Sequence, residues 1–312
     1  MSNRSELVVT PEGRMYHLGI APDEIASCVF LVGDPDRAYR VARRFDSVDH
    51  EARNREYVTI TGLYRGIPMS VVGTGIGTDN VEIALIELDA ARGIDPVSGL
   101  RRDDVRPLDI IRIGTSGGVQ ADIPAGTLCG AEYALGLDST GLYYEAPMPD
   151  RVVAEIESEA ARLLGEAAFG AARFGGNLPL YASRAHPEVS AALARQALAT
   201  GVSFESGITV SSPGFYGPSS RYIDGLVNTV PDIKGSLARL VVDGRRVLNM
   251  EMESSLLFHL AGALGHRAGT ICPAISQPGA PDALIDYEAC IEDAISIALD
   301  AMVELQGLPT DG

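Results

Sequence analysis

The sequence contains almost no lysine and no apolar run long enough to cross a membrane. Of its 25 basic residues only Lys234 is a lysine, so the other positive charges are arginine guanidinium groups. Guanidinium groups suit forked recognition of oxyanions, although genome composition alone could produce the same usage. No apolar run approaches the roughly 20 residues that span a bilayer, and the first residues lack the apolar core of a signal peptide. We therefore expect a cytoplasmic protein with no membrane partner.

Cysteine is also scarce. Cys28, Cys129, Cys272 and Cys290 are scattered along the chain and form no C-x-x-C pair. This spacing argues against both a zinc site and a disulfide framework. We expect reduced, mostly buried thiols and no metal site.

Charge of one sign predominates, with a formal net charge of −17 over 312 residues. Nucleic acid carries the same sign as the protein and is not an expected partner, so any bound anion requires a local basic site. The acidity fits a salty cytoplasm or solubility alone.

A hydrophobic fraction of 46% allows one substantial core. We expect a single domain over residues 1–312, with residues 1–15 as a flexible extension.

Short apolar runs alternate with longer amphipathic stretches. The runs have the length and β-branched content of strands, at residues 28–34, 69–75, 108–118, 207–212 and 268–276. Helical spacing predicts helices over 81–93, 151–169, 187–199, 253–264 and 287–304. Asp79 and Asn80 are expected to cap the first helix and Gly93 to end it. The alternation indicates an α/β fold, with surface loops at 95–107 and 213–225.

Glycine-rich turns follow several predicted strands: VGDPDR at 32–37, GTGIG at 73–77 and GTSGG at 114–118. Ligands in α/β folds bind at the carboxyl ends of strands, and glycine lets backbone N–H groups approach an anion. Taken singly, each turn is more typical of an ordinary tight turn. GTGIG in particular lacks the spacing of a dinucleotide-binding loop.

Arginine and glutamate residues lie near these turns. Arg37 follows the first turn, Arg55 precedes a strand, and Arg112 lies inside an apolar strand. Burying a guanidinium group is costly unless it is paired, so Arg112 should have an anionic partner, either a carboxylate or a ligand. The acidic cluster NMEMESS at 249–255 begins a predicted helix, where carboxylates can act simply as caps.

Jointly, the motifs YHLGI, VGDPDR, GTGIG, RIGTSGG, FYGPSSRY and NMEMES occur in the order and at roughly the spacing of one family. From about Tyr16 to about Met302 the chain resembles the uridine phosphorylase branch of the nucleoside phosphorylase family. The resemblance implies one α/β domain with a distorted central mixed β-sheet or barrel flanked by helices. It also implies a homo-oligomer, a hexamer built from dimers. The implied reaction is reversible phosphorolysis of a nucleoside, with uridine favoured, to ribose 1-phosphate and free base.

The resemblance also assigns site residues by matching motif positions. Phosphate would be held by Gly33, Arg37, Arg55, Arg112 and Thr115, and ribose by His17, Glu251, Met252 and Glu253. His17 and Arg55 would reach into the neighbouring subunit's phosphate site. Arg112 and Glu253 would be catalytic, because aligned phosphate and a carboxylate beside the sugar favour the cationic transition state.

Inorganic phosphate is the implied co-substrate, with no metal or redox cofactor. Members of the family sometimes hold a monovalent cation at the dimer interface, near positions that match Glu56, Ile76 and Asn80. Replacing Arg112 with alanine is expected to weaken phosphate use by orders of magnitude and to leave the fold intact. A nucleosidase that uses water would have no need for the phosphate arginines.

The chain departs from the family at the positions that bind the base. These positions hold Phe215, Ser219, Arg221, Ile275 and Gln277. Uridine enzymes have a glutamine in place of Ser219, and a hydroxyl cannot reproduce its paired amide contact. Gln277 either supplies the missing amide or is an ordinary loop residue, and Phe215 packs either on the base or in the core. The alternatives are a purine nucleoside phosphorylase and, less favoured, a nucleoside-binding protein without turnover.

Overall fold

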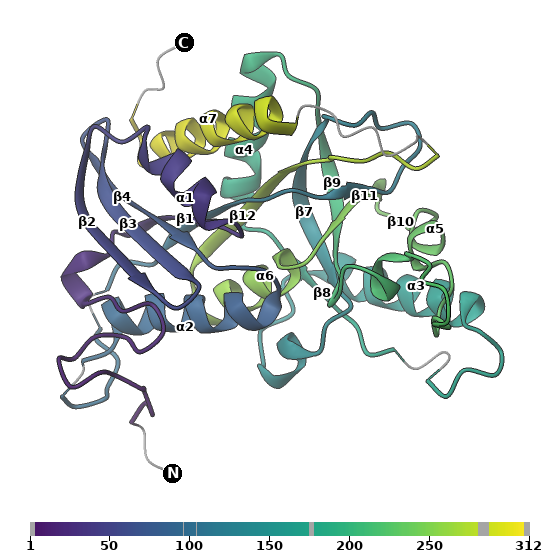
Figure 1. Cartoon of the computed structure of the whole chain (residues 1–312), viewed down its shortest axis with the longest axis horizontal. Coiled ribbons are helices and arrows are strands. Elements are labelled where there is room, and N and C mark those ends of the chain that lie inside the picture. The colour runs from purple at the N-terminus through teal and green to yellow at the C-terminus, as the bar shows by residue number, and fades with distance from the viewer. Residues whose placement is uncertain (1–3, 96, 104, 175–177, 280–286, 309–312) are drawn as a thin grey trace.

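The computed structural model describes residues 4–95, 97–103, 105–174, 178–279 and 287–308. Within them, one mixed sheet of twelve strands is flanked by seven α-helices (Figure 1). The strands are β1 Cys28–Val32, β2 Ser47–Asn54, β3 Tyr57–Tyr64, β4 Ile67–Gly73, β5 Asp109–Ile113, β6 Gly117–Gly118, β7 Leu128–Gly136, β8 Tyr181–Arg184, β9 Phe204–Ser211, β10 Val241–Val242, β11 Arg245–Glu251 and β12 Arg267–Pro273. The helices are α1 Pro35–Ala42, α2 Thr78–Gly93, α3 Arg151–Ala167, α4 Pro187–Thr200, α5 Ile233–Leu237, α6 Ser254–Leu264 and α7 Tyr287–Leu305.

The sheet consists of two parallel groups joined by an antiparallel pair. Strands β4, β1, β5 and β12 form one parallel group, and β7, β9 and β11 form the other. The two groups meet where β12 pairs antiparallel with β7. After β5 the chain turns into β6, which pairs antiparallel with β11. Because the strands run in the order β5, β12, β7, β9 and β11, this pairing connects the first strand of the series to the last. The result is a distorted, partly closed barrel that continues into an open sheet, which confirms the predicted fold class.

Helices cover both faces of the sheet and enclose separate core clusters. Side chains of α1, α4 and α7 pack on one face, and those of α2 and α6 pack on the other. Helices α3 and α5 pack at the β7 to β11 end, and the same layers are visible in Figure 1. All residues of β1 and β5 are buried, as their continuous apolar runs predict.

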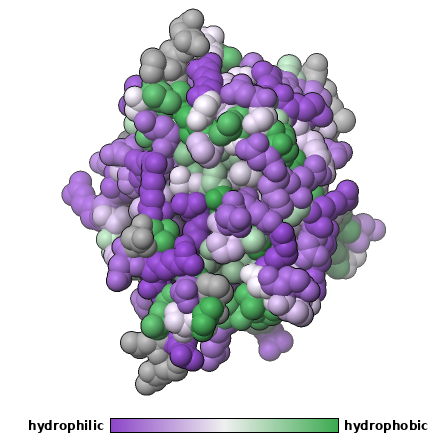
Figure 2. All heavy atoms as spheres, turned by 90° about the vertical axis from the view of Figure 1, so that its left-hand side faces the viewer, coloured by the Kyte–Doolittle hydropathy of each residue, from purple (hydrophilic) through white to green (hydrophobic). Residues whose placement is uncertain are grey.

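Strand β2 is an edge strand with charged, largely exposed residues such as Asp49, Glu51 and Arg53. Charges on an edge strand oppose pairing with another chain. Figure 2 shows this side of the molecule, which is mostly hydrophilic with hydrophobic side chains in small separate groups. The strand expected after Arg55 is β3, whereas β2, β7, β8, β10 and β11 were not predicted.

Two predicted boundaries differ from the structure. The expected strand over 108–118 is two strands, because the GTSGG turn lies between β5 and β6. Helix α2 begins at Thr78, before the expected cap at Asp79 and Asn80, with Gly77 as its N-cap at φ 98°. That conformation favours glycine. Gly93 does end the helix, as predicted.

The described N-terminal segment contacts the rest of the chain. The Ser5 N–H donates to the Gly99 carbonyl at 2.8 Å, and Met15 is buried. Residues 1–3 lie outside the described part of the chain, and the flexibility of residues 1–15 stays a prediction.

The cysteines are free, and Cys28, Cys129 and Cys272 are buried, as predicted. Burial raises the pKa of Cys272 to about 12, so its sulfur is a neutral thiol. In the part of the chain that the structure describes, no helix is long and apolar enough to span a membrane.

Candidate active site

Four strand ends meet at one place in the sheet. The turns after β1, β4 and β5 contribute Gly33, Gly77 and Gly114, and the chain leaving β11 contributes Glu253. The Gly77 N–H donates to Glu253 Oε1 at 2.8 Å. An ideal Cβ on Gly33 would lie 3.3 Å from the Gly75 carbonyl, so the first two turns also touch. The glycine-rich turns are therefore brought together around one carboxylate.

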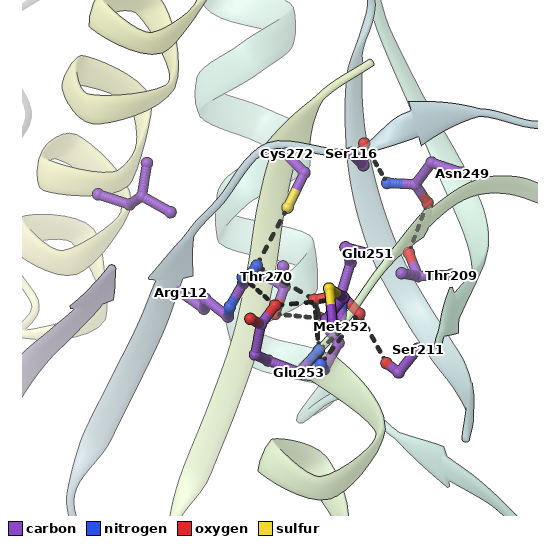
Figure 3. Close-up of polar contacts among 12 residues, drawn as sticks. Arg112, Ser116, Thr209, Ser211, Asn249, Glu251, Met252, Glu253, Thr270 and Cys272 are labelled. Carbon is purple, nitrogen blue, oxygen red and sulfur yellow. Dashed lines mark hydrogen bonds and ion pairs between the residues drawn. The ribbon is translucent and has the colours of Figure 1, made fainter. Parts of the chain in front are cut away.

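Arg112 lies at the centre of this cluster and is 4% exposed (Figure 3). Its Nη1 is 3.1 Å from Glu251 Oε2, and its Nη2 donates to Glu253 Oε2. The sequence left open whether the partner of this buried guanidinium is a carboxylate or a ligand. The structure gives it two carboxylates.

Glu251 is fully engaged inside the protein. Its carboxylate accepts hydrogen bonds from the Ser211 hydroxyl at 2.6 Å and from the N–H groups of Glu253 and Ser254 at 3.1 Å. The last two N–H groups begin α6, so Glu251 caps that helix. Capping, one of the two roles considered for the acidic cluster, is confirmed for this residue.

Glu253 is buried in the same cluster and is held by fewer groups. Besides Gly77 and Arg112, only the Met252 N–H, at 3.2 Å from Oε2, donates to its carboxylate among the described residues. Burial raises the pKa of Glu253 above its ordinary value, and the Arg112 guanidinium opposes this rise. A further cation beside this group would, like Arg112, favour its ionised form.

Gly114 is needed for the position of Arg112. An ideal Cβ at Gly114 would lie 2.0 Å from Arg112 Nη1 and 2.7 Å from Cys272 Sγ. Cys272 lies behind the guanidinium, and its sulfur accepts a weak hydrogen bond from Nη1 at 3.4 Å. A side chain at Gly114 would therefore displace the guanidinium.

Arg37 has a different environment from Arg112. It is 7% exposed, its Nη1 donates to the Ile113 carbonyl at 3.1 Å, and its Nε has no hydrogen-bond partner. Among the described residues no carboxylate lies within ion-pair distance of it. Burial lowers the pKa of Arg37, and the nearby positive charge of Arg112 lowers it further. Among the described residues, Arg37 is thus a buried guanidinium without an ion-pair partner.

Gly33 and Thr115 lie on the turns beside these arginines. Gly33 follows β1 and precedes the α1 helix that carries Arg37. Thr115 follows Gly114 and is half-buried, and no hydrogen bond to its hydroxyl is found within the described residues. A hydroxyl and turn N–H groups beside an uncompensated guanidinium can bind an oxyanion.

His17 and Arg55 form a separate surface group. Arg55 Nη2 donates to the Tyr16 hydroxyl at 2.9 Å, and Asn54 Nδ2 donates to the carbonyls of Tyr16 and His17. Arg55 has a φ of 54°, rare for a residue with a side chain. No hydrogen bond or ion pair in the described structure joins this group to Arg37 or Arg112. The predicted phosphate residues are therefore not joined in one hydrogen-bonded group within the described structure.

Glu87 holds His17 in place and was missed by the sequence reasoning. It accepts from the backbone N–H groups of His17 and Leu18 and lies 2.7 Å from His17 Nδ1. Glu87 is 8% exposed although it is charged. Its position between the apolar residues of the predicted helix was a signal that could have indicated a buried polar role.

Glu56 and Asn80 lie next to each other at the GTGIG turn. An ideal Cβ on Gly75 would lie 2.6 Å from Asn80 Nδ2 and 3.9 Å from Glu56 Cγ. Ile76 is 69% exposed. Within the described ranges no group of three or more His, Cys, Asp or Glu residues could hold a metal ion.

The base-binding candidates fall on two segments. Phe215, Ser219 and Arg221 lie together on the loop after β9, and Phe215 is 56% exposed, so it is not a core residue. Ser219 Oγ donates to the Gly214 carbonyl at 2.8 Å within this loop.

Ile275 and Gln277 follow β12. The Ile275 N–H donates to the Ser116 carbonyl at 2.8 Å, beside the GTSGG turn. The Gln277 Nε2 donates to the Ala121 carbonyl at 2.6 Å. Ser219, which replaces the family's glutamine, and Gln277, which was considered as a substitute for that amide, thus both donate to carbonyls of their own chain.

Comparison with known proteins places these features in a family. Residues 27–302 match the model of the phosphorylase superfamily. Uridine phosphorylase of Thermococcus kodakarensis is 34% identical over 84% of this chain and 77% of its own length. Uridine phosphorylase of Escherichia coli is 28% identical, over 84% and 85%. Guanosine phosphorylase of Halorubrum lacusprofundi is 26% identical, over 93% and 98%.

A solved structure agrees with the sequence relatives. The crystal structure of a Trypanosoma brucei nucleoside phosphorylase, reported to show uridine phosphorylase activity, matches with a TM-score of 0.87 and 28% identity. The match covers 96% of this chain and 100% of the other. The resemblance inferred from the motifs is confirmed: the chain belongs to the phosphorylase superfamily.

Proposed function

We propose that this protein is a nucleoside phosphorylase that cleaves the N-glycosidic bond of uridine with inorganic phosphate, giving ribose 1-phosphate and uracil. The similarity to proteins named uridine phosphorylase supports the substrate class. The observation that carries the phosphate-dependent chemistry is the buried guanidinium of Arg37, which has no carboxylate partner in the described structure.

The charges of the site support the binding of an anionic co-substrate. Both carboxylates of the cluster, Glu251 and Glu253, are bound to Arg112. When ionised, Arg112, Glu251 and Glu253 carry one positive and two negative charges. Arg37 lies beside them without an ion-pair partner among the described residues and donates only to a backbone carbonyl, so its guanidinium can bind an anion. Phosphate bound by Arg37, Gly33 and Thr115, with Arg112 on its other side, would supply that anion.

The same arrangement separates the charges that phosphorolysis develops. A phosphate oxygen forms a bond to C1′ of the ribose while the bond from C1′ to the base nitrogen breaks, and the base leaves with the electron pair. The sugar becomes cationic in the transition state, and the Glu253 carboxylate is placed to stabilise it and to accept from ribose hydroxyls. Met252 would line the ribose side. The arginines mainly orient phosphate.

We extend the proposal to a homo-oligomer. His17 and Arg55 form a basic surface group that shares no hydrogen bond with Arg37 in the described structure. We expect this if they complete the phosphate site of a neighbouring subunit. A monovalent cation would be held near Glu56, Ile76 and Asn80 at the same interface. The reaction calls on inorganic phosphate and on no redox cofactor.

A purine nucleoside substrate is the second candidate. It is favoured by the similarity to a guanosine phosphorylase over almost the full length of both chains. It is also favoured by Ser219, which replaces the glutamine of the pyrimidine pattern. The chemistry at Arg37, Arg112 and Glu253 would be the same for both substrates.

Release of free base tests the proposal directly. Uridine, thymidine, inosine, guanosine and adenosine are each incubated with the protein, with and without phosphate. Cleavage of uridine only when phosphate is present is the expected result. Phosphate-dependent cleavage of purine nucleosides alone would select the second candidate, and cleavage without phosphate would contradict the phosphorylase proposal.

A further inference from the structure

Asn249 is a polar side chain buried inside the sheet. It is 1% exposed and lies on β11, the strand that ends at Glu251. Its partners in the strand register are Thr209 on β9 and Gly118 on β6. A buried amide is costly unless it is hydrogen-bonded, so its partners show which parts of the protein it holds together.

The amide of Asn249 joins two hydroxyl groups (Figure 3). Its Oδ1 accepts from Thr209 Oγ1 at 2.7 Å, and its Nδ2 donates to Ser116 Oγ at 2.9 Å. The Ser116 hydroxyl in turn donates to the Pro273 carbonyl at 3.2 Å. Because this bond uses the only hydrogen of the hydroxyl, Ser116 Oγ is the acceptor toward Asn249, and an amide N–H is needed there.

Through Ser116, Asn249 reaches the GTSGG turn between β5 and β6. Ser116 is 4% exposed. Its N–H donates to the Pro273 carbonyl at 3.0 Å, and its carbonyl accepts from the Ile275 N–H at 2.8 Å. The end of β12 therefore holds the main chain of the turn, whereas β11 holds its side chain through Asn249.

Thr115, the preceding residue of the turn, depends on this anchor. Within the described residues neither its N–H nor its hydroxyl has a hydrogen-bond partner. It lies between Ser116 and Gly114, whose N–H donates to the Ile271 carbonyl at 3.1 Å. Free donors on a turn can bind an oxyanion, and here their position is set by the residues on either side.

We propose that Asn249 is a positioning residue for phosphate, which acts through Ser116 to hold Thr115 in a fixed position relative to the strand that leads to Glu253. This inference rests on the proposed function, in which Thr115 binds phosphate and Glu253 faces the ribose. One amide then sets the position of one reactant against the other. Reaction between two bound molecules depends on such alignment, and a misplacement of about 1 Å can lower the rate about 10²-fold.

The test measures kcat, KM for phosphate and KM for the nucleoside that wild type cleaves fastest. Wild type, Asn249→Ala, Ser116→Ala and the double variant are compared. Thr209→Val is the matched control, because it removes the hydroxyl at the other end of the same buried amide and leaves the bond from Asn249 to Ser116 in place. Urea unfolding shows that each variant is folded and measures its stability. Ser116→Ala breaks the same link with a small change in volume, so the test does not depend on the folding of Asn249→Ala.

Asn249→Ala and Ser116→Ala are each expected to raise KM for phosphate by roughly tenfold and to lower kcat, with KM for the nucleoside changed less than about twofold. The double variant should be no worse than the more impaired single variant, since both changes remove one link. Thr209→Val should lose stability and keep the phosphate KM of wild type. A normal phosphate KM in either folded single variant, an equal rise in Thr209→Val, or additive losses in the double variant would each overturn the proposal.

Failure of the proposed function is distinguishable from failure of this inference. If wild type cleaves no nucleoside with phosphate, the phosphorylase proposal fails by itself. Calorimetric titration with inorganic phosphate then decides the positioning role. Weaker binding by Asn249→Ala than by wild type and Thr209→Val supports it, and equal binding by all three, or no binding by wild type, overturns it.

Discussion

The two sides of the candidate site are built in opposite ways. On the phosphate side, Arg37, Arg112, Glu251 and Glu253 are all buried at strand ends, and their charges depend on one another. On the base side, the 212–221 loop is half-exposed, and the side chains of Ser219 and Arg221 donate to carbonyls of the same loop. Buried charges must be compensated, so they fix the chemistry, whereas an exposed loop can exchange its contacts with water. The fold therefore constrains the residues proposed for the reaction more strongly than the residues proposed to select the base.

The phosphate side contains a second contrast, between its two arginines. Arg112 has two carboxylate partners, and Arg37 has a carbonyl partner and a buried Nε without one. The first guanidinium is part of a structural ion cluster. The second has no ion-pair partner among the described residues, which is why we propose it as the phosphate ligand.

The largest expected effect is that of Arg112→Met. Removing this guanidinium leaves Glu251 and Glu253 buried without their counter-ion, and breaking a buried pair in this way costs about 3–5 kcal/mol. The earlier expectation that loss of Arg112 leaves the fold intact is therefore replaced by a large drop in the free energy of unfolding. Phosphate-dependent turnover should also fall by orders of magnitude. Urea unfolding measures the first effect, and a variant as stable as wild type would contradict the cluster as described.

Arg37→Met should show the reverse pattern. Because the removed charge has no carboxylate partner in the described structure, stability should be unchanged or higher. The KM for phosphate should rise by about 10- to 150-fold, the equivalent of one lost charged hydrogen-bond contact of 1.5–3 kcal/mol. Urea unfolding and phosphate saturation curves on the same preparations test this. A destabilised variant with normal phosphate KM would make Arg37 a structural residue.

Phosphate itself should sharpen the difference between the two arginines. A ligand at 100 times its Kd stabilises the folded protein by about 2.7 kcal/mol. Wild type should gain stability with added phosphate, and Arg37→Met should gain far less. Thermal unfolding in matched concentrations of phosphate and chloride separates specific binding from the effect of salt on this acidic chain. Equal gains in both proteins would place phosphate elsewhere.

The parts of the fold and site that sequence could predict are those governed by burial. Strand β1 is a continuous apolar run, and β5 and β12 are mostly apolar and buried. The need of Arg112 for an anion follows from its place among the apolar residues of β5. Strand β2 was not predicted because it is an edge strand whose exposed residues carry no apolar alternation. In the described structure β2 pairs with β3, the next strand along the chain, in an antiparallel hairpin.

Long-range choices between equivalent partners could not be predicted either. The sequence offered Arg112 several carboxylates, and only the fold shows that Glu251 and Glu253 both reach it. The serine at 219 and the glutamine at 277 were considered as base ligands because both side chains can hydrogen-bond. The structure shows each donating to a nearby carbonyl, Gly214 and Ala121, which a linear pattern does not reveal.

The pH dependence of stability offers a smaller test of the buried side. Burial raises the folded-state pKa of Glu253 above its unfolded value near 4.5. The folded protein therefore binds more protons than the unfolded chain between these two values, and the contribution of Glu253 to stability falls as pH rises through them. The stability of wild type relative to Glu253→Gln should decrease from pH 4 to pH 7 in urea unfolding. A difference that grows with pH would mean that the Arg112 ion pair dominates over burial.

The smallest effect is expected on the base side, for Ser219→Ala. This change removes the hydroxyl that donates to the Gly214 carbonyl and faces Ser212 Oγ. Loss of such a bond in a half-exposed loop costs about 0.5–1.5 kcal/mol. Because the hydroxyl is turned into the loop, kcat/KM for uridine and thymidine should each change by less than about threefold and in parallel, a shift below 1 kcal/mol. Steady-state kinetics with both substrates measures this. If kcat/KM fell for uridine alone, the Ser219 hydroxyl would contact the base directly. The two sides of the site would then not differ in the way described, because the 212–221 loop would not keep its hydrogen bonds to itself.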